Sequence, residues 1–250
     1  MIFSNGTFKA FCWILYGNRT TLIFANTNSS LWFLPCLFLA NIIVKIMIIL
    51  LKNNTSKLLI VSIFFMGIGF LLNNIDIKYG IPFELDNALI AVFFIIVGYF
   101  VKNNNKLFKK IINSWSCLIF LGLNIIFAFL NKIETGYVLM ADGIYGNFIF
   151  FVLGALLGSV FWIKIADLIV EKIKYRKFLL FFGVNTLTIM CIHKFLIQVF
   201  DIINGVLKIG GAIEIIVELL FVLIMSMLII PIINKYVPNL VGKNENVTNL

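Results

Sequence analysis

The sequence predicts an all-α fold, a polytopic bundle of about seven transmembrane helices (seven or eight). Hydrophobic residues make up 62% of the 250-residue chain and charged residues only 12%, whereas soluble domains average about 45–50% and about 25%. The mean hydropathy is +1.07. A soluble core cannot bury this much apolar surface, so lipid must surround most of the chain.

The apolar residues fall into seven segments, each close to the ~20 residues that a helix needs to cross a bilayer. One of them, 87–101, is short and must extend into its flanks. Residues 9–26 are interrupted by Asn18 and Arg19, and we expect them to form an interfacial helix or the remnant of a longer element. The seven predicted spans are 31–51, 58–74, 87–101, 111–130, 146–163, 178–199 and 212–234.

We predict a single integral membrane domain over residues 1–250, because the loops between the segments are short and no internal repeat is evident. Residues 1–28 would form an extracytoplasmic lead-in, and residues 235–250 a cytoplasmic tail.

The basic residues between the segments predict the orientation, because lysine and arginine concentrate in cytoplasmic loops. Thirteen lie in one set of loops and the C-terminal tail, and five lie on the opposite side. We therefore place the first set, and the C-terminus, in the cytoplasm, which puts the N-terminus outside. These loops also account for the net charge of +9, so we predict no nucleic-acid partner.

His193, the only histidine of the chain, lies inside an apolar segment. An ionisable residue within a span is a functional-site hypothesis by default. Thr186 and His193 are seven residues apart, so on one helix they share a face within ~20°, with Asn185 on an adjacent face. Two interpretations stay open: a functional histidine, or a neutral one that hydrogen-bonds a neighbouring helix.

Other patterns have ordinary structural explanations. Trp32 lies at an expected membrane interface, and Asp86 lies where the N-cap of span 87–101 would be. The four cysteines form no paired motif, and the sequence holds no metal-ligand cluster, no phosphate-binding glycine loop and no G-x-S-x-G elbow. We predict no metal site and no bound cofactor.

Three stretches taken together resemble the membrane-bound acyltransferase 3 family: "LWFLPCLFL" (31–39), "IPFELDNALIAVFFIIVGY" (81–99) and "FGVNTLTIMCIH" (182–193). The closest subgroup is named for fucose 4-O-acetylases and nodulation-factor acetylases. The positions that match its motifs are Trp32, Phe33, Leu34, Pro35, Leu37, Phe38, Pro82, Leu85, Asp86, Ala88, Leu89, Gly183, Asn185, Thr186, Leu187, Ile189 and His193.

The resemblance implies a multi-pass enzyme of the bacterial inner membrane. Such an enzyme transfers an acyl group, usually acetyl, from acyl-CoA to a hydroxyl of a cell-envelope glycan or a lipid-linked sugar. Acyl-CoA would be the donor substrate. By this resemblance His193 is the candidate catalytic residue, and Asn185, Thr186, Trp32 and Asp86 are candidates for the substrate cavity.

The chain departs from the family pattern at its start. The family's principal histidine follows a glycine in its first span, and no such segment occurs here. We therefore expect the chain to be the C-terminal portion of such an enzyme, without about its first three spans, and a separate chain could carry them. Counted from Phe178, His193 would lie ~22 Å from the cytoplasmic end of its span, so we expect the chain alone to be inactive.

A different class of function stays open beside the acyltransferase. The chain could be a component of polysaccharide export, such as a flippase, or a non-catalytic partner subunit of an envelope enzyme. Few spans and a single histidine fit the export class poorly.

The predicted topology is tested with reporter fusions. A reporter fused after Lys110 or after Lys177 should read as cytoplasmic, and one fused after Asp142 as external, because basic loops stay in the cytoplasm. The reverse pattern would contradict the assigned orientation.

Overall fold

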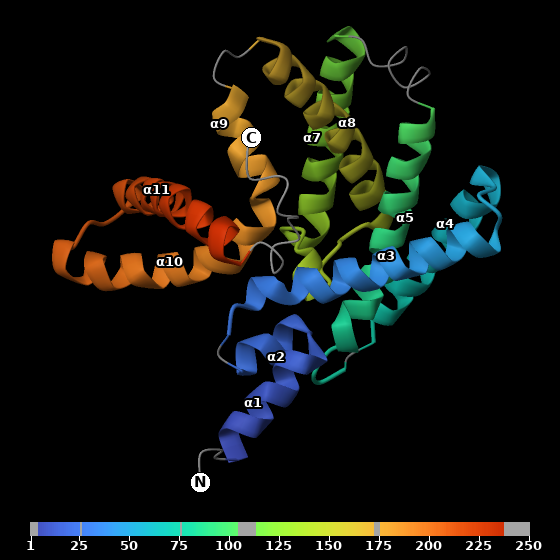
Figure 1. The fold of residues 1–250 in the computed structure, drawn as a ribbon. Helices are drawn as coiled ribbons and strands as arrows, with labels where there is room; N and C mark the ends of the chain where they lie inside the picture. The colour runs from blue at the N-terminus through green and yellow to red at the C-terminus, as the bar shows by residue number, and fades with distance from the viewer. Residues whose placement is uncertain (1–4, 26, 76, 105–113, 173–175, 238–250) are drawn as a thin grey trace. The chain divides into compact units, whose positions relative to one another are not determined.

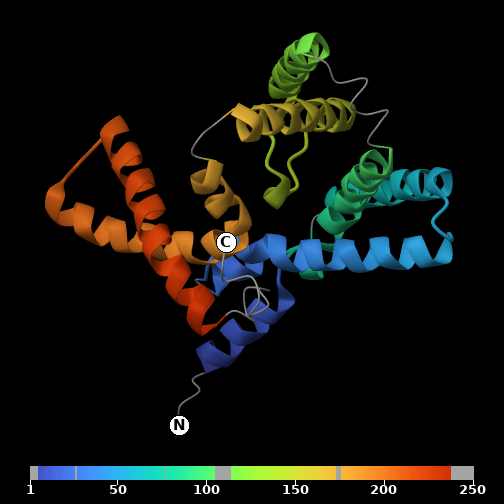
Figure 2. The ribbon, with the colours of Figure 1, turned by 45° about the horizontal axis from the view of Figure 1, so that its top comes forward.

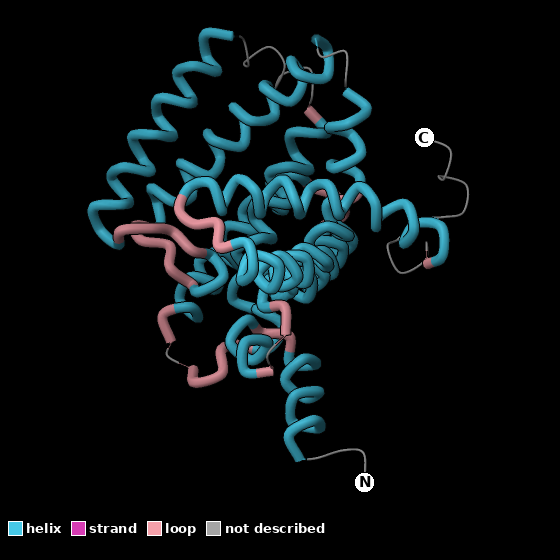
Figure 3. Tube along the Cα trace, turned by 90° about the vertical axis from the view of Figure 1, so that its left-hand side faces the viewer, coloured by secondary structure: helices cyan, strands magenta, loops and turns pink. Residues whose placement is uncertain are grey.

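The computed structural model describes residues 5–25, 27–75, 77–104, 114–172 and 176–237. These ranges form helices joined by loops, and no strand occurs within them (Figure 1, Figure 3). The chain divides into two compact units, residues 1–173 and 174–250, and each is described by itself.

The all-α polytopic fold is confirmed. Among the described residues, seven helices are long and apolar enough to cross a bilayer. Each contains most of one predicted segment, and the short one, 87–101, extends at both ends as expected. These helices are α3 (Phe33–Leu50), α4 (Thr55–Asn73), α5 (Leu85–Asn103), α7 (Ser114–Thr135), α8 (Phe148–Lys172), α10 (Thr186–Leu207) and α11 (Ala212–Tyr236).

The first unit begins with two short helices where the sequence predicted one interfacial helix. These are α1 (Asn5–Tyr16) and α2 (Arg19–Phe24). The chain turns between them at Gly17, whose φ of +67° favours glycine. Asn18 then caps α2, because its side chain accepts a hydrogen bond from the N–H of Thr20 at 2.8 Å. The interruption seen in the sequence is therefore a turn and a helix start.

Helices α3, α4 and α5 form the main apolar core of this unit, and Figure 1 shows α4 and α5 side by side. Ala40, Leu58 and Ala88 are fully buried where these helices meet. Gly69 of α4 lies so close to α5 that an added Cβ would be 2.5 Å from the Asp86 carbonyl oxygen. Glycine at this position allows the backbones of α4 and α5 to approach closely.

Helices α7 and α8 form a hairpin whose loop carries a short 3-10 helix, η3 (Met140–Asp142). Figure 2 shows this loop extending away from the two helices. Asn131 near the end of α7 fixes the loop, since it donates to the Tyr145 carbonyl at 2.9 Å and accepts from the Asn147 N–H at 2.6 Å. Tyr145 is thereby held in a buried cluster with Met66, Ile90 and Phe93.

In the second unit, the predicted sixth span, residues 178–199, is divided between two helices. Residues 178–199 are not one helix: α9 (Arg176–Val184) ends before Asn185, and α10 begins at Thr186. The Asn185 amide accounts for the break, because it donates to the Phe181 carbonyl at 2.7 Å and so competes with the helical ladder. No straight helix runs from Phe178 to His193. The predicted distance of ~22 Å between His193 and the cytoplasmic end of its span is therefore wrong. Along α10 alone, His193 lies ~10 Å from Thr186.

The close approach of α4 and α5 gives a matched pair of substitutions. Gly69→Ala should destabilise the protein by about 1–3 kcal/mol, because the new methyl group overpacks the contact. Gly67→Ala meets no atom within 4 Å and should be neutral or stabilising, since alanine favours helix. The measurement is the thermal unfolding midpoint in detergent. Equal midpoints for both variants would contradict this packing.

Candidate functional site

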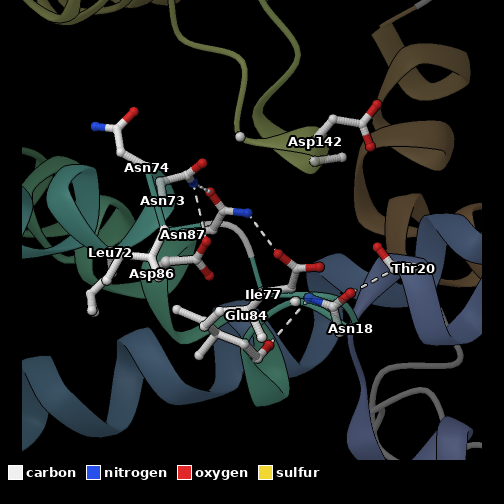
Figure 4. A pocket seen from close by; sticks show the side chains of 15 residues that line it. Asn18, Thr20, Leu72, Asn73, Asn74, Ile77, Glu84, Asp86, Asn87 and Asp142 are labelled. Carbon is white, nitrogen blue, oxygen red and sulfur yellow. Dashed lines mark hydrogen bonds between the residues drawn. The ribbon is translucent and has the colours of Figure 1, made fainter.

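A polar cavity of about 490 Å³ lies in the first unit, where α4 ends and α5 begins (Figure 4). Its wall comes from four parts of the chain: the start of α2, the end of α4 with the following loop, the first turn of α5, and η3. Amides and carboxylates dominate the lining, although the surrounding helices are apolar. The lining residues are Asn18, Thr20, Leu72, Asn73, Asn74, Ile75, Ile77, Gly80, Ile81, Glu84, Asp86, Asn87, Ala141, Asp142 and Gly143.

Glu84 is the most deeply buried carboxylate of this cavity, with only 3% of its surface exposed. One carboxylate oxygen accepts the backbone N–H of Arg19 at 2.8 Å, and the other accepts the Asn87 side chain at 2.7 Å. The residue therefore joins the N-terminal segment to α5. A buried carboxylate needs such donors, because leaving it unpaired would cost several kcal/mol.

The backbone that presents Glu84 is strained. Phe83 has φ = 56° and Glu84 has φ = 54°, and two successive non-glycine residues in the left-handed region are uncommon. Each such residue costs of order 1 kcal/mol or more, and such outliers concentrate at functional sites. The surrounding contacts must hold this conformation in place.

Asn87 links the Glu84 carboxylate to Tyr145 and Asn73 through hydrogen bonds. It is 1% exposed, and its amide oxygen accepts a short hydrogen bond from the Tyr145 hydroxyl and a longer one, at 3.4 Å, from Asn73. Asn73 also donates to Asp86 at 3.1 Å. A chain of hydrogen bonds thus runs from α4 through α5 to the α7–α8 loop.

Asp86 is not the N-cap that the sequence predicted. Helix α5 starts at Leu85 with Glu84 in the cap position, and Asp86 lies in the first turn. Its carboxylate lines the cavity, and the backbone N–H groups of Asp86 and Asn87 lie near it and offset part of its desolvation. Its Oδ2 accepts from Asn73, whereas Oδ1 is buried with no hydrogen-bond partner among the described residues.

Arg19 and Asp142 form an ion pair between α2 and η3. Both side chains are partly exposed, so the pair contributes little stability by itself. It does connect two parts of the cavity wall. Gly143 beside it has φ = +69°, and a side chain there would overlap the Asn73 amide. Glycine is thus required for the close approach of this loop to α4.

Burial raises the pKa of Tyr145 well above its ordinary value, and the nearby carboxylates raise it further. The hydroxyl therefore stays protonated and remains a hydrogen-bond donor to Asn87. A phenolate has no proton to donate, so the bond to the Asn87 amide oxygen depends on the protonated hydroxyl.

The structure places the sequence-predicted residues in different parts of the chain. Asp86 lines the cavity, whereas Trp32 does not; it ends the 3-10 helix η1 (Ser29–Trp32) and packs at the edge of the apolar core. Asn185, Thr186 and His193 belong to the second unit. Asn185 is buried there and accepts a hydrogen bond from Asn234 of α11 at 3.2 Å.

Thr186 and His193 both make local contacts in the second unit. The Thr186 hydroxyl donates to the Gly183 carbonyl at 2.8 Å. His193 is half-buried, and its Nδ1 lies 2.8 Å from the Met190 carbonyl oxygen. That bond requires a proton on Nδ1, so the neutral ring has Nε2 as an acceptor.

Glu84, Asn87 and Tyr145 are not among the site residues predicted from the sequence. Glu84 and Asn87 lie in the "IPFELDNAL" stretch, on either side of Asp86. Several polar residues at the start of an apolar segment are the signal that could have indicated them. Tyr145 carries no such signal, because only the return of the α7–α8 loop brings it to Asn87.

A family model identifies the family to which the chain belongs. The family model described as an acyltransferase domain, acyltransferase 3, matches residues 2–235. The chain belongs to the acyltransferase 3 family. It is therefore a multi-pass membrane protein of an acyltransferase family, and the general resemblance seen in the sequence is confirmed. No curated protein and no solved structure gives a significant match to this acyltransferase-family chain.

The raised pKa of Tyr145 predicts how stability changes in alkali. Above pH ~10 the unfolded chain releases the tyrosine proton, whereas the folded protein retains it. Stability therefore falls as the pH rises above ~10, by at most ~1.4 kcal/mol per pH unit for this group. Tyr145→Phe should make the alkaline decline shallower, and should lower stability at neutral pH by about 1–3 kcal/mol because Asn87 loses its donor.

The measurement is the unfolding midpoint between pH 7 and pH 12 in detergent. Tyr137→Phe is the matched control, because it removes the hydroxyl of a tyrosine in the same loop that is 57% exposed. An alkaline decline in Tyr145→Phe as steep as that of the control would show that Tyr145 is not the group responsible.

Proposed function

We propose that this protein is an O-acyltransferase of the bacterial inner membrane. In this proposal it transfers an acyl group, usually acetyl, from acyl-CoA to a hydroxyl of a cell-envelope sugar or polysaccharide. The membership in the acyltransferase 3 family supports acyl transfer in general. The single observation that carries the acceptor is the polar cavity of the first unit.

The cavity lies at the end of α4 that the charge pattern assigns to the outer side of the membrane. The basic loop before Thr55 marks the opposite, predicted cytoplasmic end of that helix. Nineteen residues of α4 correspond to ~28 Å, about the thickness of the hydrocarbon core. An acceptor glycan of the cell envelope would therefore meet the cavity without crossing the bilayer.

The chemistry of the cavity suits a polyhydroxylated acceptor. Hydroxyl groups both donate and accept hydrogen bonds, and the cavity-lining amides of Asn73 and Asn74 and the carboxylate of Asp142, which are not fully buried, supply matching groups. A volume of about 490 Å³ falls within the ~300–1,000 Å³ usual for small-molecule pockets.

Acyl transfer itself needs a group that takes the acceptor's proton. The acceptor oxygen attacks the thioester carbonyl carbon, its proton passes to the base, the C–S bond breaks, and CoA leaves as a thiolate that is then protonated. A positioned base contributes typically 10²–10⁴-fold. By the resemblance to the family, His193 of the second unit is the candidate for this role, and the bond from its Nδ1 to the Met190 carbonyl leaves Nε2 as an acceptor.

The test follows CoA release from acetyl-CoA in proteoliposomes supplied with envelope glycan. Release should depend on the acceptor, and His193→Ala should lower it by ~10²-fold or more. Cys191→Ala, a neighbouring change in α10, should retain turnover. The assay is run with the chain alone and with a co-expressed membrane polypeptide that carries a first-span Gly-His segment.

Acceptor-dependent release in either arrangement supports the proposal. No release in both arrangements, with correctly folded protein, would overturn it. If His193→Ala lowers the yield of folded protein but leaves the turnover per folded molecule unchanged, His193 holds helices together and is not the base.

A further inference from the structure

Helix α10 is the least apolar of the seven candidate spans among the described residues, and its polar residues are gathered on one side. At 100° per residue, one arc of ~140° contains every charged, amide and imidazole side chain of the helix. The rest of the circumference is apolar apart from Thr188 and Cys191. We call the polar residues within this arc the polar stripe of α10: Thr186, His193, Lys194, Gln198, Asp201 and Asn204.

The two edges of the polar stripe have different surroundings in the second unit. One edge borders the contact with α11, where Asn204 donates to the Glu214 carboxylate at 2.8 Å and His193 is half-buried. The side chains of Gln198 and Asp201, toward the other edge, are exposed. The stripe is therefore a polar surface of α10 that α11 covers only in part.

The polar stripe extends from the end of the helix deep into the membrane. Measured from Leu207, the predicted outer end of α10, Asp201 lies at ~9 Å, Gln198 at ~14 Å and His193 at ~21 Å. The helix itself has 22 residues, or ~33 Å, which exceeds the ~30 Å of the hydrocarbon core by little. Polar groups thus follow one another at about every helical turn from the outer surface to the imidazole.

Lipid does not suit the exposed part of this stripe. Hydrocarbon offers no hydrogen-bond partner to an amide or a carboxylate, and ionisable side chains within a span face the bundle interior or a water-filled cavity. A second helix could cover the stripe only by supplying a matched polar partner at every turn. Water satisfies the amide of Gln198 and the carboxylate of Asp201 alike, and the stripe meets water at its outer end.

We propose that the polar stripe of α10 lines a water-filled path from the outer face of the membrane to His193, along which a hydroxyl-bearing acceptor reaches the imidazole. The acceptor's part in this rests on the proposed function. The path ends where it is needed, because Nε2 of His193 is the ring nitrogen left to accept a proton from an arriving hydroxyl. Gln198 and Asp201 exchange hydrogen bonds with the hydroxyls on the way and so replace the water that the acceptor loses.

The test measures thiol modification in sealed, right-side-out vesicles that contain the full chain. The four native cysteines are replaced by alanine, and single cysteines are then introduced. A small, charged methanethiosulfonate that does not cross lipid is added outside. Gln198→Cys and Asp201→Cys should react at least about tenfold faster than cysteines outside the stripe, because the reaction requires access to water and a thiolate.

Two exposed apolar positions of the same helix are the matched controls. Phe195 is 65% exposed and Ile202 is 76% exposed, and both lie outside the polar stripe. Phe195→Cys and Ile202→Cys should be protected, because lipid covers them. All four cysteines should react once the vesicles are dissolved and the chain is unfolded, which shows that each thiol is present. Two test positions keep the proposal testable if one variant does not fold.

The role of the acceptor is tested by the acyl-transfer assay. Complete modification of Gln198→Cys should lower acceptor-dependent CoA release at least about tenfold relative to the same variant before modification, because the added group displaces the acceptor from its position. The cysteine-free chain, treated with the same reagent, should be unaffected.

The path is overturned if the stripe cysteines react no faster than the controls, as they would if lipid, another helix or a second copy covered them. Reaction from the cytoplasmic side alone also overturns it. CoA release that survives complete modification removes the acceptor's route and leaves the acyltransferase function standing. Rapid modification of the stripe without transfer to any acceptor removes the proposed function, and the acceptor's route with it, and leaves the water-filled path standing.

Discussion

The buried carboxylate of Glu84 is the constraint on which the polar half of the first unit depends. It accepts one hydrogen bond from the N-terminal segment and one from α5, and in a low-dielectric setting each such bond to a charged group is worth about 1.5–3 kcal/mol. The strained backbone at Phe83 and Glu84 is tolerable because these bonds, and the packing of the first turn of α5, hold it. Losing either donor would leave a desolvated oxygen without a partner.

The network beyond Glu84 explains why a polar cavity can exist beside lipid-facing helices. Asn87 accepts hydrogen bonds from Tyr145 and Asn73. Side-chain hydrogen bonds, and not only apolar packing, therefore hold α4, α5 and the α7–α8 loop together. Buried polar networks of this kind are stable only when nearly every member is satisfied. The exception is Asp86 Oδ1, which is buried and has no hydrogen-bond partner among the described residues.

The second unit uses an asparagine in a different way. Asn185 interrupts what its apolar sequence would otherwise make a single helix, and it accepts a hydrogen bond from Asn234 on α11. The break lets α10 start a new helix direction, and it sets the position of His193 within α10. The histidine then satisfies its own Nδ1 locally, which leaves one ring nitrogen available for chemistry.

The sequence by itself determined the class of the protein and its spans. Apolar segments of bilayer length fix seven helices because the backbone has no other way to be satisfied in lipid, and the motifs around Trp32, Asp86 and His193 were sufficient to place the chain near its family. Tertiary structure alone decided the site. Asn73, Glu84 and Tyr145 are separated by loops of the chain, and hydropathy carries no information on which polar groups meet when helices pack.

The helix break at Asn185 could not be predicted from the sequence pattern either. In a hydropathy profile, an amide that hydrogen-bonds to its own helix cannot be distinguished from one that points into a bundle. Likewise, Glu84 and not Asp86 occupies the N-cap position of α5, because the buried hydrogen bonds of Glu84 hold its left-handed backbone conformation. Residue preferences at helix starts do not include that contribution.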